Sequence, residues 1–417
     1  MPASDPAFLS DVRVLAAYLI AAGSYFVFAL GKFPGMKIDR PGAAIIGAVL
    51  MVAFRIVGGR EALASIDFAT IVLLFSMMLV VANLRVVGFF DWITERVIQR
   101  LHPHHLLPTV IFSSGLLSAF LVNDVVCVVL TPFVVHLARR LERPPVPYVV
   151  AVATAANIGS VATITGNPQN MLIGSMSGIS YVDFMARLGP VALIGLFLNW
   201  AIVGWLSRAA RGDRVNVDAA LTAPEFQLRP LRKKPVIVLV LVLAGFLAGV
   251  PPALAAAVGA ALMLITRTVE PRQVYDGIDW GLLVFFTGLF VIVGGAERAG
   301  LTSSLLHPIA AWNLHRLGLF VTVTATLSNI VSNVPAVMLL RTLVPGFPYP
   351  HSAWLALAMA STLAGNLTIT GSVANIIAVE CAAREGVAVS FQEYFRVGLP
   401  VTVATLAVGS LWLWLAT

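Results

Sequence analysis

The chain has 417 residues, of which 59% are hydrophobic and 11% are charged, and its formal net charge is +7. Water-soluble proteins carry charge at about 25% of their positions, so this composition excludes a soluble globular protein and indicates a membrane-embedded one. The positive charge does not indicate nucleic-acid binding, because the basic residues lie in short segments between apolar runs.

Apolar runs in chain order predict an all-helical, polytopic membrane protein. In the first half they cover residues 14–30, 43–57, 68–82, 106–122, 125–138, 146–161 and 188–206. The basic segment 208–234 follows as a predicted cytoplasmic linker. The pattern then resumes at residues 236–249, 253–266, 281–294, 319–330, 334–344, 353–363 and 397–415. Several runs are shorter than the ~20 residues of a straight spanning helix, which at matching places in two halves is typical of a transporter's binding site.

Four matches in register predict an internal repeat, residues 1–207 and 235–417. They pair ITGNPQN at residues 164–170 with ITGSVAN at residues 369–375, Asn123 with Asn333, Asp67 with Asp279, and residues 87–89 with 299–301. Each repeat is expected to contain about five crossings, one re-entrant hairpin, one broken helix and one surface helix. The hairpins are predicted at about residues 106–138 and 319–345, the broken helices at about 146–178 and 353–383, and the surface helices at 88–101 and 300–317.

The distribution of charge predicts an orientation. With the N-terminus outside, this topology places 20 of the 27 Lys and Arg residues in cytoplasmic segments, in agreement with the positive-inside rule. Five crossings is an odd number, so the second repeat is predicted to be inverted relative to the first. We therefore expect a multi-pass protein of the cell inner membrane with a cytoplasmic central linker.

The hairpin tips and helix breaks carry polar side chains. Glycine permits irregular backbone there, and Asn, Ser and Thr are good caps for a helix that resumes. Irregular backbone at bilayer depth is tolerated around a cavity, where four helix N-termini would converge and offer free N–H groups. These segments contain no Lys or Arg, which suits a small oxygen-rich solute or an anion; alternatively, the amides only hold helices together. The predicted substrate-binding residues are Asn123, Thr165, Gly166, Asn167, Gln169, Asn170, Ser332, Asn333, Thr370, Gly371, Ser372 and Asn375.

Asp124 is the only carboxylate in these segments. A carboxylate at membrane depth is costly unless it serves as an ion or proton site, so Asp124 is the predicted carrier of a coupling proton. Its alternative role is to cap the helix that follows, and the two roles are compatible. Glu380, close to Arg384 in the sequence, is predicted to be an interface residue.

No motif indicates catalysis. The chain has no G-x-x-x-x-G-K-[ST] loop and no H-E-x-x-H, and its two cysteines, Cys127 and Cys381, are not spaced as C-x-x-C. We therefore expect a protein that is not an enzyme, with no catalytic residue, no metal site and no cofactor. Energy would come from a proton or sodium gradient, or from a partner ATPase.

The segments FLVNDVVCVVLTP, ANIGSVATITGNPQN, SNIVSNVPAVMLL and TLAGNLTITGSVAN resemble the ion transporter superfamily. From about residue 68 to the C-terminus, the chain looks closest to the ArsB-type arsenical pumps and the plant silicon effluxers. It is more distantly similar to NhaD-type sodium/proton antiporters and to dicarboxylate/sulfate carriers. The resemblance implies an elevator-type secondary transporter, often a homodimer, in which a transport domain moves against a scaffold domain.

The resemblance also implies roles for particular residues. The family's Asn-Asp hairpin motif matches Asn123 and Asp124. Its glycine and amide motifs match Gly166, Asn167, Gln169 and Asn170 in the first half and Ser332, Asn333, Gly371, Ser372 and Asn375 in the second. The paired Ser-Asn-Thr signatures of the dicarboxylate carriers are absent, since the two tips read Val-Asn-Asp and Ser-Asn-Val. This departure favours proton coupling through Asp124.

Three functional hypotheses follow. The first is proton-coupled efflux of a small metalloid hydroxy acid, arsenite or antimonite, with silicic acid close behind, because neutral polyhydroxy solutes suit amides, hydroxyls and helix ends. The second is a sodium-coupled anion or carboxylate carrier, or a sodium/proton antiporter. The third is the membrane subunit of an ATPase-driven arsenite pump, with the basic linker as its docking surface.

Overall fold

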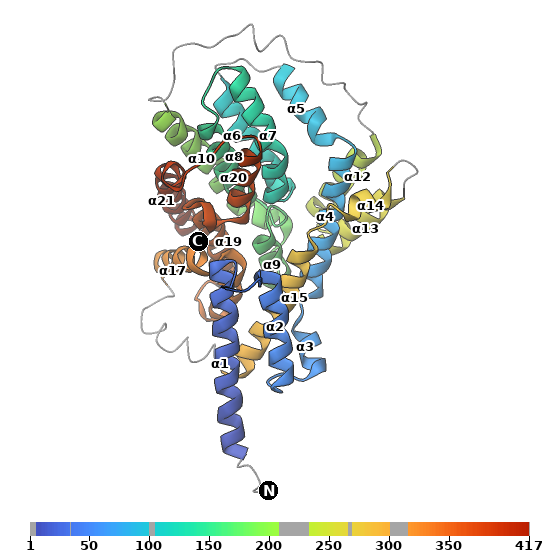
Figure 1. The fold of residues 1–417 in the computed structure, drawn as a ribbon, viewed down its shortest axis with the longest axis vertical. Coiled ribbons are helices and arrows are strands. Elements are labelled where there is room, and N and C mark those ends of the chain that lie inside the picture. Colours follow the sequence, from blue (N-terminus) through green and yellow to red (C-terminus); the bar gives the residue numbers. More distant parts are fainter. Residues whose placement is uncertain are drawn as a thin grey trace.

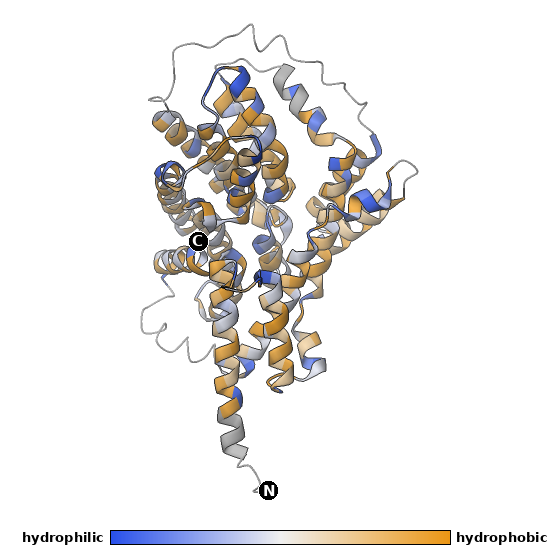
Figure 2. Cartoon of the chain, viewed as in Figure 1, coloured by the Kyte–Doolittle hydropathy of each residue, from blue (hydrophilic) through white to orange (hydrophobic). Residues whose placement is uncertain are grey.

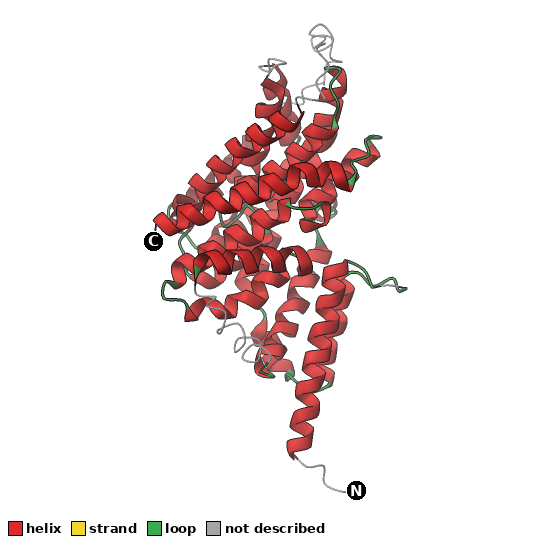
Figure 3. Cartoon of the chain, turned by 90° about the vertical axis from the view of Figure 1, so that its left-hand side faces the viewer, coloured by secondary structure: helices red, strands yellow, loops and turns green. Residues whose placement is uncertain are grey.

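The computed structural model describes residues 6–33, 35–99, 105–207, 233–265, 269–300 and 316–416. Across these ranges the chain is helical and contains no strand, apart from one isolated bridge (Figure 1, Figure 3). Five of the described helices are long and apolar enough to cross a membrane, within the ranges Val12–Leu30, Phe68–Val86, Tyr181–Ser207, Trp280–Arg298 and Phe391–Leu415. Hydrophobic residues cover most of the helical surface (Figure 2). The predicted all-helical, polytopic fold is confirmed.

The first helices of each half pack together into one unit, which we call the outer bundle. In the first half these are α1 (Pro6–Leu30), α2 (Arg40–Ala53), α3 (Gly59–Ser65) and α4 (Phe68–Val86). In the second half they are α12 (Lys233–Leu247), α13 (Pro252–Leu264), α14 (Pro271–Tyr275) and α15 (Trp280–Arg298). Helix α2 packs against α15 and α4 packs against α13, so within this bundle helices of the first half pack against helices of the second.

The remaining helices form a second unit, the hairpin bundle (Figure 1). Its first-half members are α6 (Leu106–Phe120), α7 (Asn123–Arg140), α8 (Val146–Ser160), α9 (Pro168–Ser177) and α10 (Tyr181–Ser207). Its second-half members are α17 (Leu317–Val331), α18 (Asn333–Leu340), α19 (Pro350–Leu363), α20 (Val373–Arg384) and α21 (Phe391–Leu415). Helix α8 lies at the centre, with every side chain from Tyr148 to Ser160 buried. Small residues allow this, since a Cβ on Gly159 would lie 2.0 Å from the carbonyl oxygen of Gly115 in α6.

Apart from α5 (Phe89–Gln99), each described helix of the first half has a counterpart in the second half. Helices α4 and α15 have 19 residues each and start after an aspartate, Asp67 or Asp279, whose side chain accepts a backbone N–H of the first turn. Helices α10 and α21 each contain an internal proline, Pro190 and Pro400. The predicted surface helix at residues 88–101 is α5 (Phe89–Gln99), whereas its counterpart and most of the linker lie outside the described residues.

Each half contains one tight helix–helix turn and one break. The turns join α6 to α7 and α17 to α18, and in the second turn Ser332 has a φ of 80° and a ψ of 159°. That conformation is rare for residues other than glycine, so the second turn is strained. The breaks separate α8 from α9 and α19 from α20, and short 3-10 turns fill the second one.

Candidate functional site

The first break is a compact turn held by one amide. Asn170 Nδ2 donates to the carbonyl oxygens of Ser160 and Thr163, each at 3.0 Å. Asn167 caps α9, because its Oδ1 accepts the backbone N–H of Asn170 at 2.8 Å. A Cβ on Gly166 would lie 2.2 Å from the Ser160 carbonyl oxygen, so only glycine fits there. The turn therefore depends on its glycine and on the amide of Asn170.

The second break repeats this construction 205 residues later. Asn375 Nδ2 donates to the carbonyl oxygens of Gly365 at 2.6 Å and Thr368 at 2.9 Å. A Cβ on Gly371 would lie 2.8 Å from the Gly365 carbonyl oxygen. Ser372 precedes α20 but its hydroxyl bonds elsewhere rather than capping the helix. In both breaks, the amide hydrogens of the predicted binding asparagine are engaged within the protein.

Asn157, near the end of α8, joins the first half to the second break. Its Oδ1 accepts from Asn123 Nδ2 and from Ser372 Oγ, both at 3.0 Å. Its Nδ2 donates to the side-chain oxygens of Asn366 at 2.9 Å and Asn375 at 2.8 Å. We call these five residues the amide hub; each is at most 5% exposed.

Asn157 and Asn366 are not among the predicted binding residues. Both lie in the segments that carry the family resemblance. Asn157 is the one amide in an alanine-rich, mostly apolar helix, and this is the signal that could have singled it out.

Thr362 is the repeat counterpart of Asn157. Asn167 Nδ2 and Gln169 Nε2 donate to Thr362 Oγ1 at 3.2 and 3.1 Å, and Thr362 Oγ1 lies 3.5 Å from Asn170 Oδ1. The first half thus binds the second break through Asn157, and the second half binds the first break through Thr362. Such a reciprocal exchange is what a two-fold relation between the halves produces.

The hairpin tips rest on the breaks. The backbone N–H of Asn123 donates to the carbonyl oxygen of Gly166 at 3.0 Å. With its amide nitrogen turned inward, Asn333 donates to the carbonyl oxygen of Gly371 at 3.2 Å and to Ser328 Oγ at 2.6 Å. Ser332 lies beside it and is partly exposed. The structure therefore brings Asn123 and Asn333 each to the break of its own half.

The two predicted threonines differ in their surroundings. Thr165 is fully buried, and its hydroxyl lies 2.9 Å from the hydroxyl of Tyr181. Thr370 is exposed, and Phe391 occupies the place that corresponds to Tyr181. The first break is therefore closed and the second is open.

Two buried atoms of the amide hub have no hydrogen-bond partner within the described part of the chain. They are Asn123 Oδ1, an acceptor, and Asn366 Nδ2, a donor. Buried polar groups in folded proteins are almost always paired, and these two are among twelve unpaired buried side-chain atoms of the described residues. A solute with hydroxyl groups, which both donate and accept, matches this pair chemically.

Asp124 lies next to the hub in the first turn of α7 and is partly buried. Among the described residues, none forms a hydrogen bond or an ion pair with its carboxylate. No side chain caps α7, so the alternative role of Asp124 as a helix cap is wrong. The carboxylate of Asp279 acts on it electrostatically. Because Asp279 is the N-cap of α15, Asp124 lies within electrostatic range of the outer bundle.

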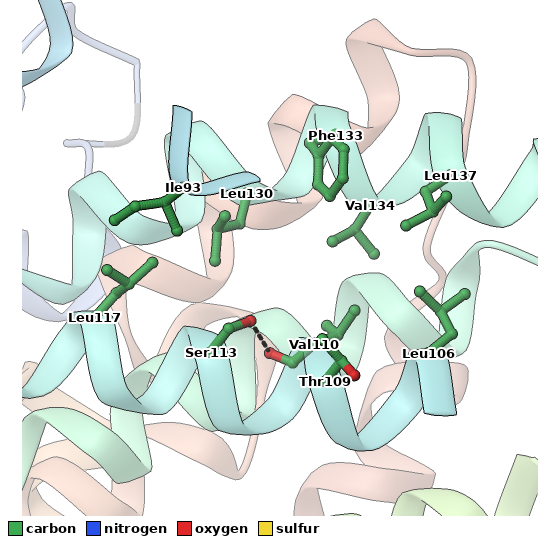
Figure 4. Close-up of a pocket in the computed structure, with 10 residues that line it drawn as sticks. All are labelled: Ile93, Leu106, Thr109, Val110, Ser113, Leu117, Leu130, Phe133, Val134 and Leu137. Atoms are coloured by element: carbon green, nitrogen blue, oxygen red, sulfur yellow. Dashed lines mark hydrogen bonds between the residues drawn. The ribbon is translucent and has the colours of Figure 1, made fainter. Parts of the chain in front are cut away.

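A groove between the arms of the first hairpin does not suit a polar solute (Figure 4). Its lining is Ile93, Leu106, Thr109, Val110, Ser113, Leu117, Leu130, Phe133, Val134 and Leu137. The hydroxyl of Ser113 donates to the carbonyl oxygen of Val110 at 3.3 Å, which leaves walls of hydrocarbon with few polar atoms. The described residues also contain no group of three His, Cys, Asp or Glu side chains that could hold a metal ion.

Comparison with known proteins gives consistent matches over most of the chain. The pattern of the family described as "Citrate transporter" (CitMHS) matches residues 25–364. An uncharacterized transporter of Mycobacterium tuberculosis (strain ATCC 25618 / H37Rv) is 30% identical over 420 residues, which cover 95% of this chain and 98% of the relative. The silicon efflux transporter LSI3 of Oryza sativa subsp. japonica is 30% identical over 463 residues, covering 94% and 96%. The solved YdaH transporter of Alcanivorax borkumensis shares the fold, with a TM-score of 0.58, 17% identity and 98% coverage of both chains.

Proposed function

Since the chain belongs to the citrate transporter family, within the ion transporter superfamily, we propose that it exports a small uncharged metalloid hydroxy acid in exchange for protons. Its relatives are named transporters, so it is a multi-pass secondary transporter and not an enzyme. Arsenite and antimonite are the first solutes in this proposal, and silicic acid is the next. The similarity to a silicon efflux transporter supports this class of solute.

The observation that carries the proposal is the make-up of the amide hub. Its side chains are four amides and one hydroxyl, and the unpaired atoms are one donor and one acceptor. A neutral acid such as As(OH)₃ carries O–H groups that suit Asn123 Oδ1 and oxygen acceptors that suit Asn366 Nδ2. A carboxylate offers acceptors only and is normally bound by Arg or Lys. The hub therefore favours the neutral solute.

Asp124 is the residue that we propose for proton coupling. A carboxylate without a hydrogen-bond partner, next to the hub and within electrostatic range of the outer bundle, can gain and lose a proton as the two bundles separate. We further propose that the hairpin bundle moves against the outer bundle as an elevator, in an inner membrane. The positive-inside distribution supports an external N-terminus and a cytoplasmic linker.

The description of the family favours a second candidate, a sodium-coupled carrier of citrate or another carboxylate. The two candidates predict different driving ions and different solutes. Uptake by proteoliposomes separates them, because the internal and external ions and the solute are chosen independently.

The test uses purified protein in proteoliposomes with an imposed pH gradient and neither sodium nor ATP. We expect accumulation of antimonite against its concentration gradient, and loss of this accumulation in Asp124→Asn with unchanged thermal stability. Asp276→Asn, an exposed carboxylate at the end of α14, is the matched control and keeps wild-type rates. Sodium-dependent citrate uptake without antimonite transport would establish the second candidate. Activity that appears only with ATP and a partner subunit would contradict both.

A further inference from the structure

Three polar contacts fasten the hairpin bundle to one end of the outer bundle. The hydroxyl of Tyr25 in α1 donates to the carbonyl oxygen of Pro335 in α18 at 3.3 Å. Ser175 Oγ in α9 donates to Asp67 Oδ2 at the start of α4, at 2.6 Å. Arg341 Nη2, just after α18, pairs with Glu297 Oε1 at the end of α15, at 2.8 Å. An ion pair between α3 and α15 holds the end of α15 beside the start of α4, so the last two contacts lie together. We call this the occupied end.

The repeat supplies counterparts of these groups at the opposite end of the outer bundle. Asp279 corresponds to Asp67 and Arg85 to Glu297, each with an offset of 212 residues, and Glu380 in α20 corresponds to Ser175 with an offset of 205. Among the described residues, no hydrogen bond or ion pair joins Glu380 to the outer bundle. The charges are nonetheless near, since Arg85 acts electrostatically on Cys381, the neighbour of Glu380. We call this the vacant end.

The charges at the vacant end are reversed relative to the occupied end. At the occupied end the outer bundle contributes carboxylates and the hairpin bundle contributes a hydroxyl and an arginine. At the vacant end the hairpin bundle contributes the carboxylate of Glu380. A carboxylate cannot approach Asp279 without a counter-charge, and Arg85 on the outer bundle provides one.

Other charged groups also face this region. Arg384 lies one turn after Glu380 on the same helix, and Asp124 lies within electrostatic range of Asp279. Glu385 is held by His136 of α7 at 3.0 Å. On the outer bundle, Arg85 is the counterpart of Glu297 and supplies a positive charge that can receive Glu380.

We propose that the vacant end is a second docking site for the hairpin bundle, in which Glu380 binds Arg85 after the bundle has left Asp67 and Glu297. The proposal rests on the proposed function, because transport requires the bundle to visit two positions. The two-fold relation between the halves gives the second position the same geometry as the first. The sequence predicts Glu380 to be an interface residue, and in the second position its partner is Arg85.

Disulfide trapping tests the docking directly and requires no transported solute. In a Cys127→Ala/Cys381→Ala background, the pair D67C/S175C is expected to cross-link in native membranes under mild oxidation. The pair D279C/E380C is expected to cross-link as well, and each cross-link should stop transport. Efficient cross-linking of the first pair without any cross-linking of the second would overturn the proposal. A failure to transport antimonite would overturn the proposed function but leave this result standing.

A charge test separates docking from mere proximity. Arg85→Ala should lower the rate of antimonite transport about tenfold or more, because Glu380 then meets Asp279 without a counter-charge. Adding Glu380→Ser recreates the Ser175–Asp67 pair of the occupied end, and should return the rate to within about threefold of wild type. Arg384→Ala is the control and should keep the wild-type rate. No recovery in the double variant would contradict the assigned pair.

Discussion

The two helix breaks are built in the same way but are covered differently. In the first, every side chain from Thr163 to Asn170 is buried, and Tyr181 closes over Thr165. In the second, Thr370 is exposed and Val373 is 40% exposed. In both breaks one asparagine amide donates to two backbone carbonyl oxygens, and this pairing holds the broken helix at bilayer depth. Because Thr370 and Val373 are exposed, the second break is the one that solvent can reach at the surface of this structure.

The groups that hold the two breaks also differ. Asn157 makes four hydrogen bonds, three with residues of the second break and one with Asn123, whereas Thr362 offers one hydroxyl to the first break. The first break compensates through its own contacts, because Asn167 Nδ2 also donates to Ser160 Oγ at 2.8 Å. The open break is therefore held from the other half, and the closed break is held largely by itself.

Removing these central groups should give the largest effect. Asn157→Leu leaves the polar groups of four partners unpaired in a buried site, so we expect a loss of about 4 kcal/mol of unfolding free energy. Thr362→Val, its counterpart, leaves two amide donors unpaired and should cost about 2 kcal/mol. Denaturant titration in mixed micelles measures both. Equal losses of unfolding free energy in the two variants would show that Asn157 does not stabilise its break more than Thr362 does.

Adding one methyl group to each glycine should give the next effect. Gly166→Ala places a Cβ 2.2 Å from a backbone carbonyl oxygen, and should destabilise the protein by about 3 kcal/mol. In Gly371→Ala the corresponding distance is 2.8 Å, and this smaller overlap should limit the loss to about 1 kcal/mol. Thermal unfolding followed by size-exclusion chromatography ranks the two. The opposite ranking would show that the depth of this overlap does not govern the loss of stability.

Removing the hydroxyl that closes the first break should have a smaller effect. Tyr181→Phe leaves Thr165 without its partner at 2.9 Å, and should cost about 1 kcal/mol. The reverse change in the other half, Phe391→Tyr, has no such partner to gain and serves as the control, with stability close to wild type. Thermal unfolding of both variants measures this. A wild-type melting temperature in Tyr181→Phe would mean that the hydroxyl does not fasten the first break.

The exposed threonine should give the smallest change in stability. Thr370→Val alters a side chain that is open to its surroundings, so the unfolding free energy should change by less than about 0.5 kcal/mol. Thr165→Val removes the buried counterpart and should cost about 1 kcal/mol. Paired melting curves compare them. A larger loss for Thr370→Val would indicate that the second break is covered rather than open.

The order and extent of the helices could be predicted from the apolar runs, except where polar residues lie on a helix. The run at residues 188–206 understates α10, which begins at Tyr181. The hydroxyl of Ser180 accepts the backbone N–H of Asp183 at 3.1 Å, and the charged Asp183 and Arg187 interrupt the apolar pattern. In the same way α21 begins at Phe391, where Ser390 and Glu393 form a capping box. Charged turns break the hydrophobic pattern without ending the helix.

The hub could be predicted only in part. Glycine and amide motifs identified the breaks, since local backbone demands glycine there. They did not show that the hydrogens of Asn170 and Asn375 are engaged in holding each break. Nor could they show that Asn157 meets Asn366, 209 residues away, because such a contact depends on the packing of the two halves. Motifs locate a site, whereas tertiary structure decides which of its groups remain free.

If the solute binds at the amide hub, diffraction from crystals soaked in antimonite will show the metalloid there. Anomalous data collected at an antimony absorption edge locate the metalloid without reference to transport. The account predicts one peak within hydrogen-bonding reach of Asn123 Oδ1 and Asn366 Nδ2. A peak beside Cys127 or Cys381, with the hub empty, would contradict it.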